Sequence, residues 1–108
     1  MNICKDHQET VALFGELTPI FQVLADENRQ QILMYLSEFE GRTVAELAAD
    51  FSLSRPAISH HLKVLKTCGL VGVRKQGTRN YYYLRLAEVL PQIRRLLDSM
   101  EYHCNIID

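Results

Sequence analysis

The sequence predicts a mainly α-helical domain that carries one small β-hairpin. Apolar residues recur at helical spacing through most of the chain, and two β-rich runs, 70–73 and 81–84, flank a polar turn that contains Gly77. The stretch 54–85 also holds seven of the 12 basic residues and none of the 13 acidic ones. Because the formal net charge is only −1, this clustering indicates a surface that neutralises phosphates.

The length of 108 residues fits one domain, so residues 1–108 are expected to fold as a single unit. Hydrophobic residues at 47% and charged residues at 23% are typical of globular proteins. No apolar run is long enough for a membrane span or a signal peptide, so we expect a cytoplasmic protein without a membrane partner. The three cysteines lie far apart, which argues against a disulfide framework.

Residues 1–8 carry no periodicity, and three helices are expected between them and Gly41. Thr18 followed by Pro19 resembles an N-cap with proline in the first helical position, which divides the N-terminal region into two short helices. Asp26 is the next N-cap, and it opens a third helix that ends before Gly41.

A helix-turn-helix is predicted in the middle of the chain. Thr43 and Glu46 form a capping box at the start of a short helix. After a tight turn Ser54 caps a second helix, which ends near Gly69, a glycine suited to the left-handed C-terminal position. Two helices joined by a short turn, the second of them basic, form the helix-turn-helix arrangement.

The second helix of this motif is expected to have one buried and one exposed face. Ile58, Leu62 and Leu65 fall on one line at the ~100° step of an α-helix. The opposite face is small, polar and basic, as entry into the DNA major groove requires. We expect DNA contact for His60 and a half-buried hydrogen bond for His61, because adjacent residues project about 100° apart. The exposed face comprises Pro56, Ser59, His60, Lys63 and Thr67.

The hairpin is expected to present positive charge at its tip. Gly77 can supply the positive φ that a tight turn requires. Arg74, Lys75 and Arg79 flank this turn, so they are placed to meet a phosphate backbone or the minor groove. A helix-turn-helix followed by such a hairpin is a winged helix.

A last helix is expected to begin near Glu88. Its apolar residues lie at helical spacing on one side. The helices before it already provide enough apolar residues for the core of the domain. This stripe predicts a dimer seam with the stripe around Phe14 and Leu17 as its partner, so residues 1–17 and 88–108 are assigned to dimerisation. The stripe on the last helix comprises Ile93, Leu96, Leu97, Met100 and Cys104.

Three segments occur in a recognisable order and spacing. They are VLADENR (23–29), LSRPAISHHLKVL (53–65), and GLV (69–71) followed by RKQG (74–77). Together they resemble the ArsR/SmtB family of winged-helix repressors, and the resemblance covers roughly residues 17–102. It implies a homodimer that binds an inverted-repeat operator in double-stranded DNA and leaves it when an effector binds or oxidises the protein.

The resemblance also implies which residues contact DNA. Lys63 matches a position near phosphate, and Arg79 with the neighbouring wing residues Arg74 and Lys75 would approach the minor groove. The positions that match major-groove contacts are Ser54, Arg55, Ala57, Ser59 and His60.

Effector sites of the family are incomplete in this chain. Where relatives carry Cys-Val-Cys-Asp-Leu, residues 43–47 read TVAEL and lack both thiols. Persulfide-sensing relatives have a cysteine in the helix after Asp26, and residues 30–36 contain none. The effector, a metal ion or a small molecule, therefore stays open, and no cofactor is expected. The positions that match the zinc-type site on the last helix are Leu86, Glu88, Ser99 and Tyr102, which retain one oxygen ligand at best.

Two alternatives to this function remain open. In the first, Cys4, His103 and Cys104 meet near the paired terminal helices and form a metal- or thiol-responsive site. Packing is the simpler role for Cys68 and for Cys104, which continues an apolar stripe. In the second, the winged helix binds proteins and not DNA, although its polar helix face lacks aromatic anchors. An enzyme is not expected, because no phosphate loop, nucleophile–base pair or paired carboxylates occur.

Overall fold

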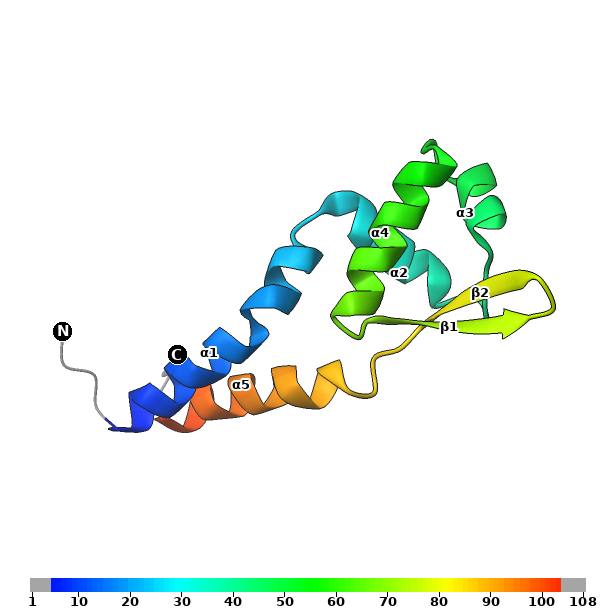
Figure 1. The fold of residues 1–108 in the computed structure, drawn as a ribbon. Helices are drawn as coiled ribbons and strands as arrows, with labels where there is room; N and C mark the ends of the chain where they lie inside the picture. The colour runs from blue at the N-terminus through cyan, green and yellow to red at the C-terminus, as the bar shows by residue number, and fades with distance from the viewer. Residues whose placement is uncertain (1–4, 104–108) are drawn as a thin grey trace.

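The computed structural model describes residues 5–103, which form five helices and one antiparallel hairpin (Figure 1). The predicted fold class, mainly α-helical with a small β-hairpin, is therefore confirmed. None of the helices in this part of the chain is long and apolar enough to cross a membrane. In chain order the elements are α1 (Lys5–Leu24), α2 (Glu27–Leu36), α3 (Val44–Asp50), α4 (Arg55–Thr67), β1 (Val71–Gln76), β2 (Arg79–Leu84) and α5 (Val89–His103).

Helix α1 is continuous where the sequence predicted two helices. Pro19 lies inside it, so the predicted helix start at Thr18 and Pro19 is wrong. Proline removes one amide donor from a helix, whereas the Thr18 hydroxyl donates to the Phe14 carbonyl oxygen at 2.8 Å and bonds back within the helix. The continuous helix keeps its apolar side in the core, with Leu17 only 1% exposed. Burial of that side favours continuity in spite of the proline.

The other predicted helix starts are confirmed by their caps. The Asp26 carboxylate accepts a hydrogen bond at 3.1 Å from the amide three residues later, and this bond lowers the pKa of Asp26. Thr43 and Glu46 form the capping box, with Thr43 Oγ1 accepting from the Glu46 amide at 3.1 Å. The Ser54 hydroxyl caps α4. At its other end Gly69 adopts φ +83°, as predicted.

Helix α4 lies at the centre of the core. Its line of Ile58, Leu62 and Leu65 is fully buried, as the helical spacing predicted. The helix packs against α3, β1 and α2, so its opposite side faces outward. The side chains that these neighbours bury in the same cluster are Ile32, Leu33, Leu36, Leu47 and Val71.

The hairpin is longer than the sequence predicted. Gln76 pairs with Arg79, so only two residues form the turn, and Gly77 in that turn adopts φ +62°. The strands were expected to end at residue 73 and to resume at residue 81, which is wrong because main-chain pairing continues through polar residues. A third segment adds to the sheet, because Arg42 and Tyr82 exchange two backbone hydrogen bonds of 2.9 and 2.8 Å.

Helices α1 and α5 pack side by side at one end of the molecule (Figure 1). The hydroxyl oxygens of Thr10 and Ser99 lie 2.6 Å apart between them, and both residues are buried. Because a buried hydroxyl needs a partner, this pair ties the two helices together.

The apolar stripes that were predicted to form a dimer seam pack partly inside the chain itself. Leu17 is buried in the chain's own core, so it cannot form part of an outer seam. On α5 Leu96 is 3% exposed but Leu97 is 57% exposed, so the predicted stripe does not lie on one side. Phe14 remains 41% exposed. Cys104, the last member of the stripe, lies outside the described residues.

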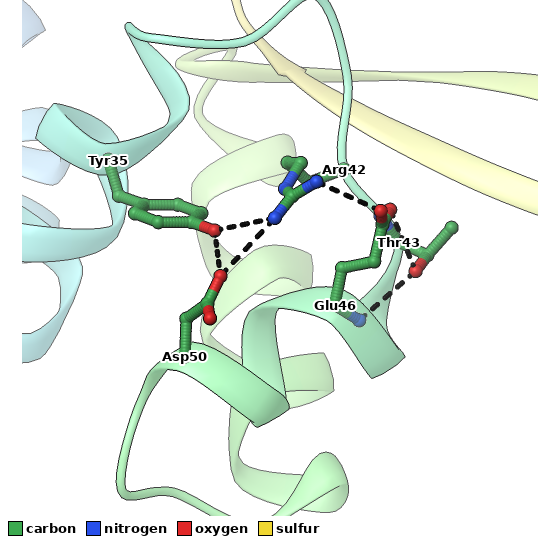
Figure 2. Close-up of polar contacts among 5 residues, drawn as sticks. All are labelled: Tyr35, Arg42, Thr43, Glu46 and Asp50. Carbon is green, nitrogen blue, oxygen red and sulfur yellow. Dashed lines mark hydrogen bonds and ion pairs between the residues drawn. The ribbon is translucent and has the colours of Figure 1, made fainter.

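Arg42 joins α2 and α3 to the hairpin through its side chain and its backbone. Figure 2 shows its guanidinium between Tyr35 of α2 and two carboxylates of α3. Its Nη1 donates to Glu46 Oε2 at 2.9 Å, and its Nη2 donates to the Tyr35 hydroxyl at 2.9 Å and to Asp50 Oδ2 at 3.3 Å. The Tyr35 hydroxyl also donates to Asp50. This bond, and then Arg42, hold the pKa of Asp50 below its usual value.

A second polar contact links α2 to α4. The Nε of Arg29 donates to Nδ1 of His61 at 3.3 Å, so the predicted half-buried hydrogen bond of His61 is confirmed. Burial lowers the pKa of His61, with the Arg29 and His60 charges acting in the same direction and Asp26 opposing them. Protonation of Nδ1 would remove the acceptor and place a cation beside the guanidinium.

Replacement of Arg42 by methionine is expected to lower the urea midpoint of unfolding, because Glu46 and Asp50 lose their shared cation. Urea denaturation followed by far-UV circular dichroism measures this change. Arg94→Met, on an exposed position of α5, is the matched control. Equal midpoints for the two variants would contradict a stabilising role for Arg42.

Stability is expected to decrease as the pH falls below the ordinary histidine pKa of about 6.5. Because the pKa of His61 is lower in the folded state, the unfolded chain binds more protons in this range. The contribution is complete above that value and is lost as the pH falls toward the folded-state pKa. Urea titrations at a series of pH values should show a flatter dependence for His61→Gln. Arg94→Met, the exposed control on α5, should keep the dependence of the parent protein.

Candidate nucleic-acid interface

The exposed side of α4 brings the predicted base-reading residues together. Its orientation follows from the buried line on the other side of the helix. Ala57 is half-buried, so its methyl group is only partly accessible. The remaining predicted residues on this helix, Ser54, Arg55, Ser59, His60 and Lys63, are all exposed.

The start of α4 adds positive potential to this side. The Ser54 hydroxyl oxygen accepts from the Ala57 amide at 3.2 Å, and its own proton is free to be donated outward. The N-terminal end of a helix carries a partial positive charge, which favours an approaching phosphate. Arg55 stands in the first turn of α4, so its charge adds to that of the helix end.

The basic side chains of α4 and the wing are not engaged in ion pairs. Within residues 7–102 the ion pairs join Arg42 to Glu46 and Asp50, and Arg85 to Glu88. None of them involves α4, and the chain has no acidic residue between positions 51 and 87. The charges on this surface therefore remain available to an external anion. These residues are Arg55, Lys63, Lys66, Arg74, Lys75 and Arg79.

The register of the hairpin separates the three predicted wing residues. Arg74 lies opposite Tyr81 and Arg79 lies opposite Gln76, whereas Lys75 lies opposite Asn80. Directly opposed residues share a face and successive residues alternate, so the two arginines lie on one face and Lys75 lies on the other. The sequence grouped all three together, and the structure divides them.

Arg74 and Arg79 differ in their surroundings although they share a face. Arg74 lies back against the loop before α3, where a methyl group added to Gly41 would be 3.3 Å from its Nη2. Arg79 directly follows the two-residue turn, so it projects farther along the wing. It also lies near the start of α3, because its charge helps to lower the pKa of Glu46, which is lowered mainly by the Thr43 amide. Both arginines are exposed, and Arg79 stands nearer the turn of the hairpin.

The positions that match the family's zinc-type site are engaged in protein contacts. Ser99 bonds to Thr10, and a carboxylate oxygen of Glu88 accepts from Arg85 at 2.5 Å. No group of three or more His, Cys, Asp or Glu side chains within the described part of the chain could hold a metal ion. The candidates Cys4 and Cys104, and the side chain of His103, lie outside the described part.

Cys68 is a packing residue, as predicted. It is half-buried at the end of α4, and its Sγ donates to the Leu65 carbonyl oxygen at 3.4 Å. Burial raises the pKa of this thiol, so less of it is present as the reactive thiolate.

Comparisons with known proteins agree with this fold. Residues 26–73 match the family described as bacterial regulatory proteins of the arsR family. The chain is 35% identical over 95 residues to the arsenical resistance operon repressor of Staphylococcus aureus, which covers 88% of this chain and 83% of that protein. An ArsR-like transcriptional regulator from Rhodococcus sp. RHA1 has a similar structure, with a TM-score of 0.78 and 34% identity over 88% of this chain and 85% of that one.

A further solved structure is the homodimeric winged helix-turn-helix DNA-binding domain of a possible ArsR-family regulator from Mycobacterium bovis. Its TM-score is 0.64 at 26% identity, covering 100% of this chain and 94% of that one. The matched segment 26–73 contains both helices of the helix-turn-helix and the start of the wing. The chain therefore belongs to the arsR family of bacterial regulatory proteins, and it is a DNA-binding regulator of transcription.

Proposed function

We propose that this regulator is a homodimeric repressor that binds an inverted-repeat operator and leaves it when an effector binds. The observation that carries the proposal is the surface of α4 and the wing, where no cation of the described residues is held in an ion pair. The Staphylococcus aureus relative is a repressor, which supports repression as the function. The Mycobacterium bovis neighbour is homodimeric, which supports the dimer.

The surface divides into base-reading and phosphate-binding side chains. Ser59 and His60 lie on the outer side of α4, and a hydroxyl and an imidazole can donate to or accept from base edges in the major groove. Lys63 and Arg79 carry mobile charges that suit phosphate oxygens. Sequence preference therefore depends on α4, and affinity depends on both elements.

Exposed apolar side chains on α1 and α5 support the homodimer. Val11 is 52% exposed, Phe14 is 41% exposed and Leu97 is 57% exposed. All three lie on the pair of helices that packs together at one end of the molecule (Figure 1). Large apolar side chains that stay exposed on a pair of packed helices are typical of a surface that is covered by a partner. A two-fold dimer would also place two copies of α4 on an inverted repeat.

A function in protein binding without DNA is not favoured by the surface of α4. Apart from the His60 imidazole, its outward side chains are not aromatic, whereas protein-binding hot spots favour tryptophan and tyrosine. Its basic side chains without ion-pair partners suit phosphates better than a protein surface.

Selection from a pool of random-sequence DNA duplexes tests the proposed function. The full chain is expected to enrich an inverted repeat whose half-sites lie about one helical turn apart. Ser59→Ala and His60→Ala should each lose about 1–3 kcal/mol of discrimination between the selected duplex and a scrambled one. Arg79→Ala should weaken both alike and reduce the log–log salt slope by about 0.9 for each phosphate that the variant no longer neutralises. Arg94→Ala on α5 is the control. A pool without any enriched sequence would refute the function.

Leu97→Asp is expected to convert the dimer into monomers, because it places a charge on the exposed apolar surface of α1 and α5. Light scattering coupled to size exclusion measures the mass of the species in solution. Met34→Glu is the matched control, since Met34 is 63% exposed but lies on α2. If Leu97→Asp stays dimeric, the dimer uses another surface.

A further inference from the structure

A groove of about 390 Å³ lies between the C-terminal half of α1 and the outer side of α4. Pro19 and Val23 line it from α1, and Val64 and Cys68 line it from α4. This volume is within the range of small-molecule sites, which is roughly 300–1,000 Å³. The groove is separate from the pairing of α1 with α5, which lies toward the other end of α1 (Figure 1).

The groove combines an apolar lining with positive charge. His60 and Lys63 line it from α4 beside the apolar residues. Lys63 forms no ion pair within the described residues, and no acidic side chain lines the groove. A hydrophobic site with a few polar groups that fix orientation is the usual form of a ligand pocket. Its charge is complementary to an apolar molecule with a negative end.

We propose that this groove binds a small amphipathic carboxylate, which would be the effector of the regulator. The aromatic or short aliphatic body lies against Pro19, Val23 and Val64, and the carboxylate lies at Lys63 and His60. The bound anion and a DNA phosphate compete for the same two side chains, because both residues also belong to the outer side of α4. The competition between ligand and phosphate rests on the proposed DNA-binding role of that surface.

Competition of this kind releases DNA without a change in fold. The ligand and the phosphate cannot both occupy the ammonium of Lys63. If occupation is mutually exclusive, a ligand at ten times its dissociation constant weakens DNA binding about tenfold. An uncharged molecule of the same shape would enter the apolar groove but would leave the phosphate contact in place.

The binding arm of the test uses 2-naphthoate, with 2-naphthamide as its neutral isostere, and the full chain without DNA. In NMR titrations the acid is expected to shift the amide signals of Val23 and Val64 and to bind about tenfold more tightly than the amide. Lys63→Gln should remove this preference. Lys66→Gln, on the same helix but outside the groove, should retain it. Thr67→Phe, which narrows the groove from an exposed position, should weaken the binding of both molecules.

The competition arm measures how tightly the protein binds the selected duplex in the presence of 2-naphthoate or of 2-naphthamide. The acid should raise the apparent dissociation constant for DNA, and the amide should not. If no duplex is selected, the proposed function fails, while the binding arm still decides whether the site exists. Equal affinity for acid and amide, or an unchanged preference in Lys63→Gln, overturns the site. Unchanged DNA affinity with naphthoate bound overturns the competition. Mixed-label NMR samples show whether Val23 and Val64 contact a second copy of the chain. Such contacts would assign the groove to an interface and would also overturn the proposed ligand site.

Discussion

The burial of one side of α4 is the constraint on which the rest of the structure depends. Ile58, Leu62 and Leu65 are completely removed from water, and burial of such a side chain contributes about 1.5–3 kcal/mol. A rotation of the helix that exposed any of them would lose that contribution. The rotation of α4 is therefore set by its apolar side, and the positions of Ser59 and His60 on the outer side follow from it. The burial of the apolar side chains of α4 thus determines which of its polar side chains point outward.

Polar contacts around α4 complete this arrangement without reducing its positive charge. Arg42 forms ion pairs with Glu46 and Asp50, the two carboxylates of α3, which is the helix that packs against α4. Part of the negative charge next to the proposed DNA-binding surface is thereby offset within the fold. Arg29 bonds to the inner histidine, His61, so its guanidinium is directed toward the α2–α4 contact. Arg42 and Arg29 thus bind partners within the fold, whereas the basic side chains of α4 and the wing form no ion pair within the described residues.

Helices α1 and α5 show how one amphipathic pair can serve two purposes. Their inner sides bury Leu17 and Leu96 and join the hydroxyl groups of Thr10 and Ser99. Their outer sides leave other apolar residues exposed, Leu97 most clearly at 57%. Because an α-helix turns about 100° per residue, neighbours such as Leu96 and Leu97 necessarily face different surroundings. The same two helices can therefore stabilise one chain and also offer a surface to another.

The sequence by itself determined the features that depend on neighbours along the chain. The caps at Thr43 and Ser54, the two sides of α4 and the positive φ at Gly77 follow from residues within one or two turns. Only the tertiary structure decided that α1 continues through Pro19, that the wing arginines share a face without Lys75, and that a groove opens between α1 and α4. Each of these depends on contacts between segments far apart in the chain, such as the buried side of α1 or the strand register. The periodicity of the sequence indicates which side of a helix is apolar. Which segment packs against that side depends on the tertiary structure.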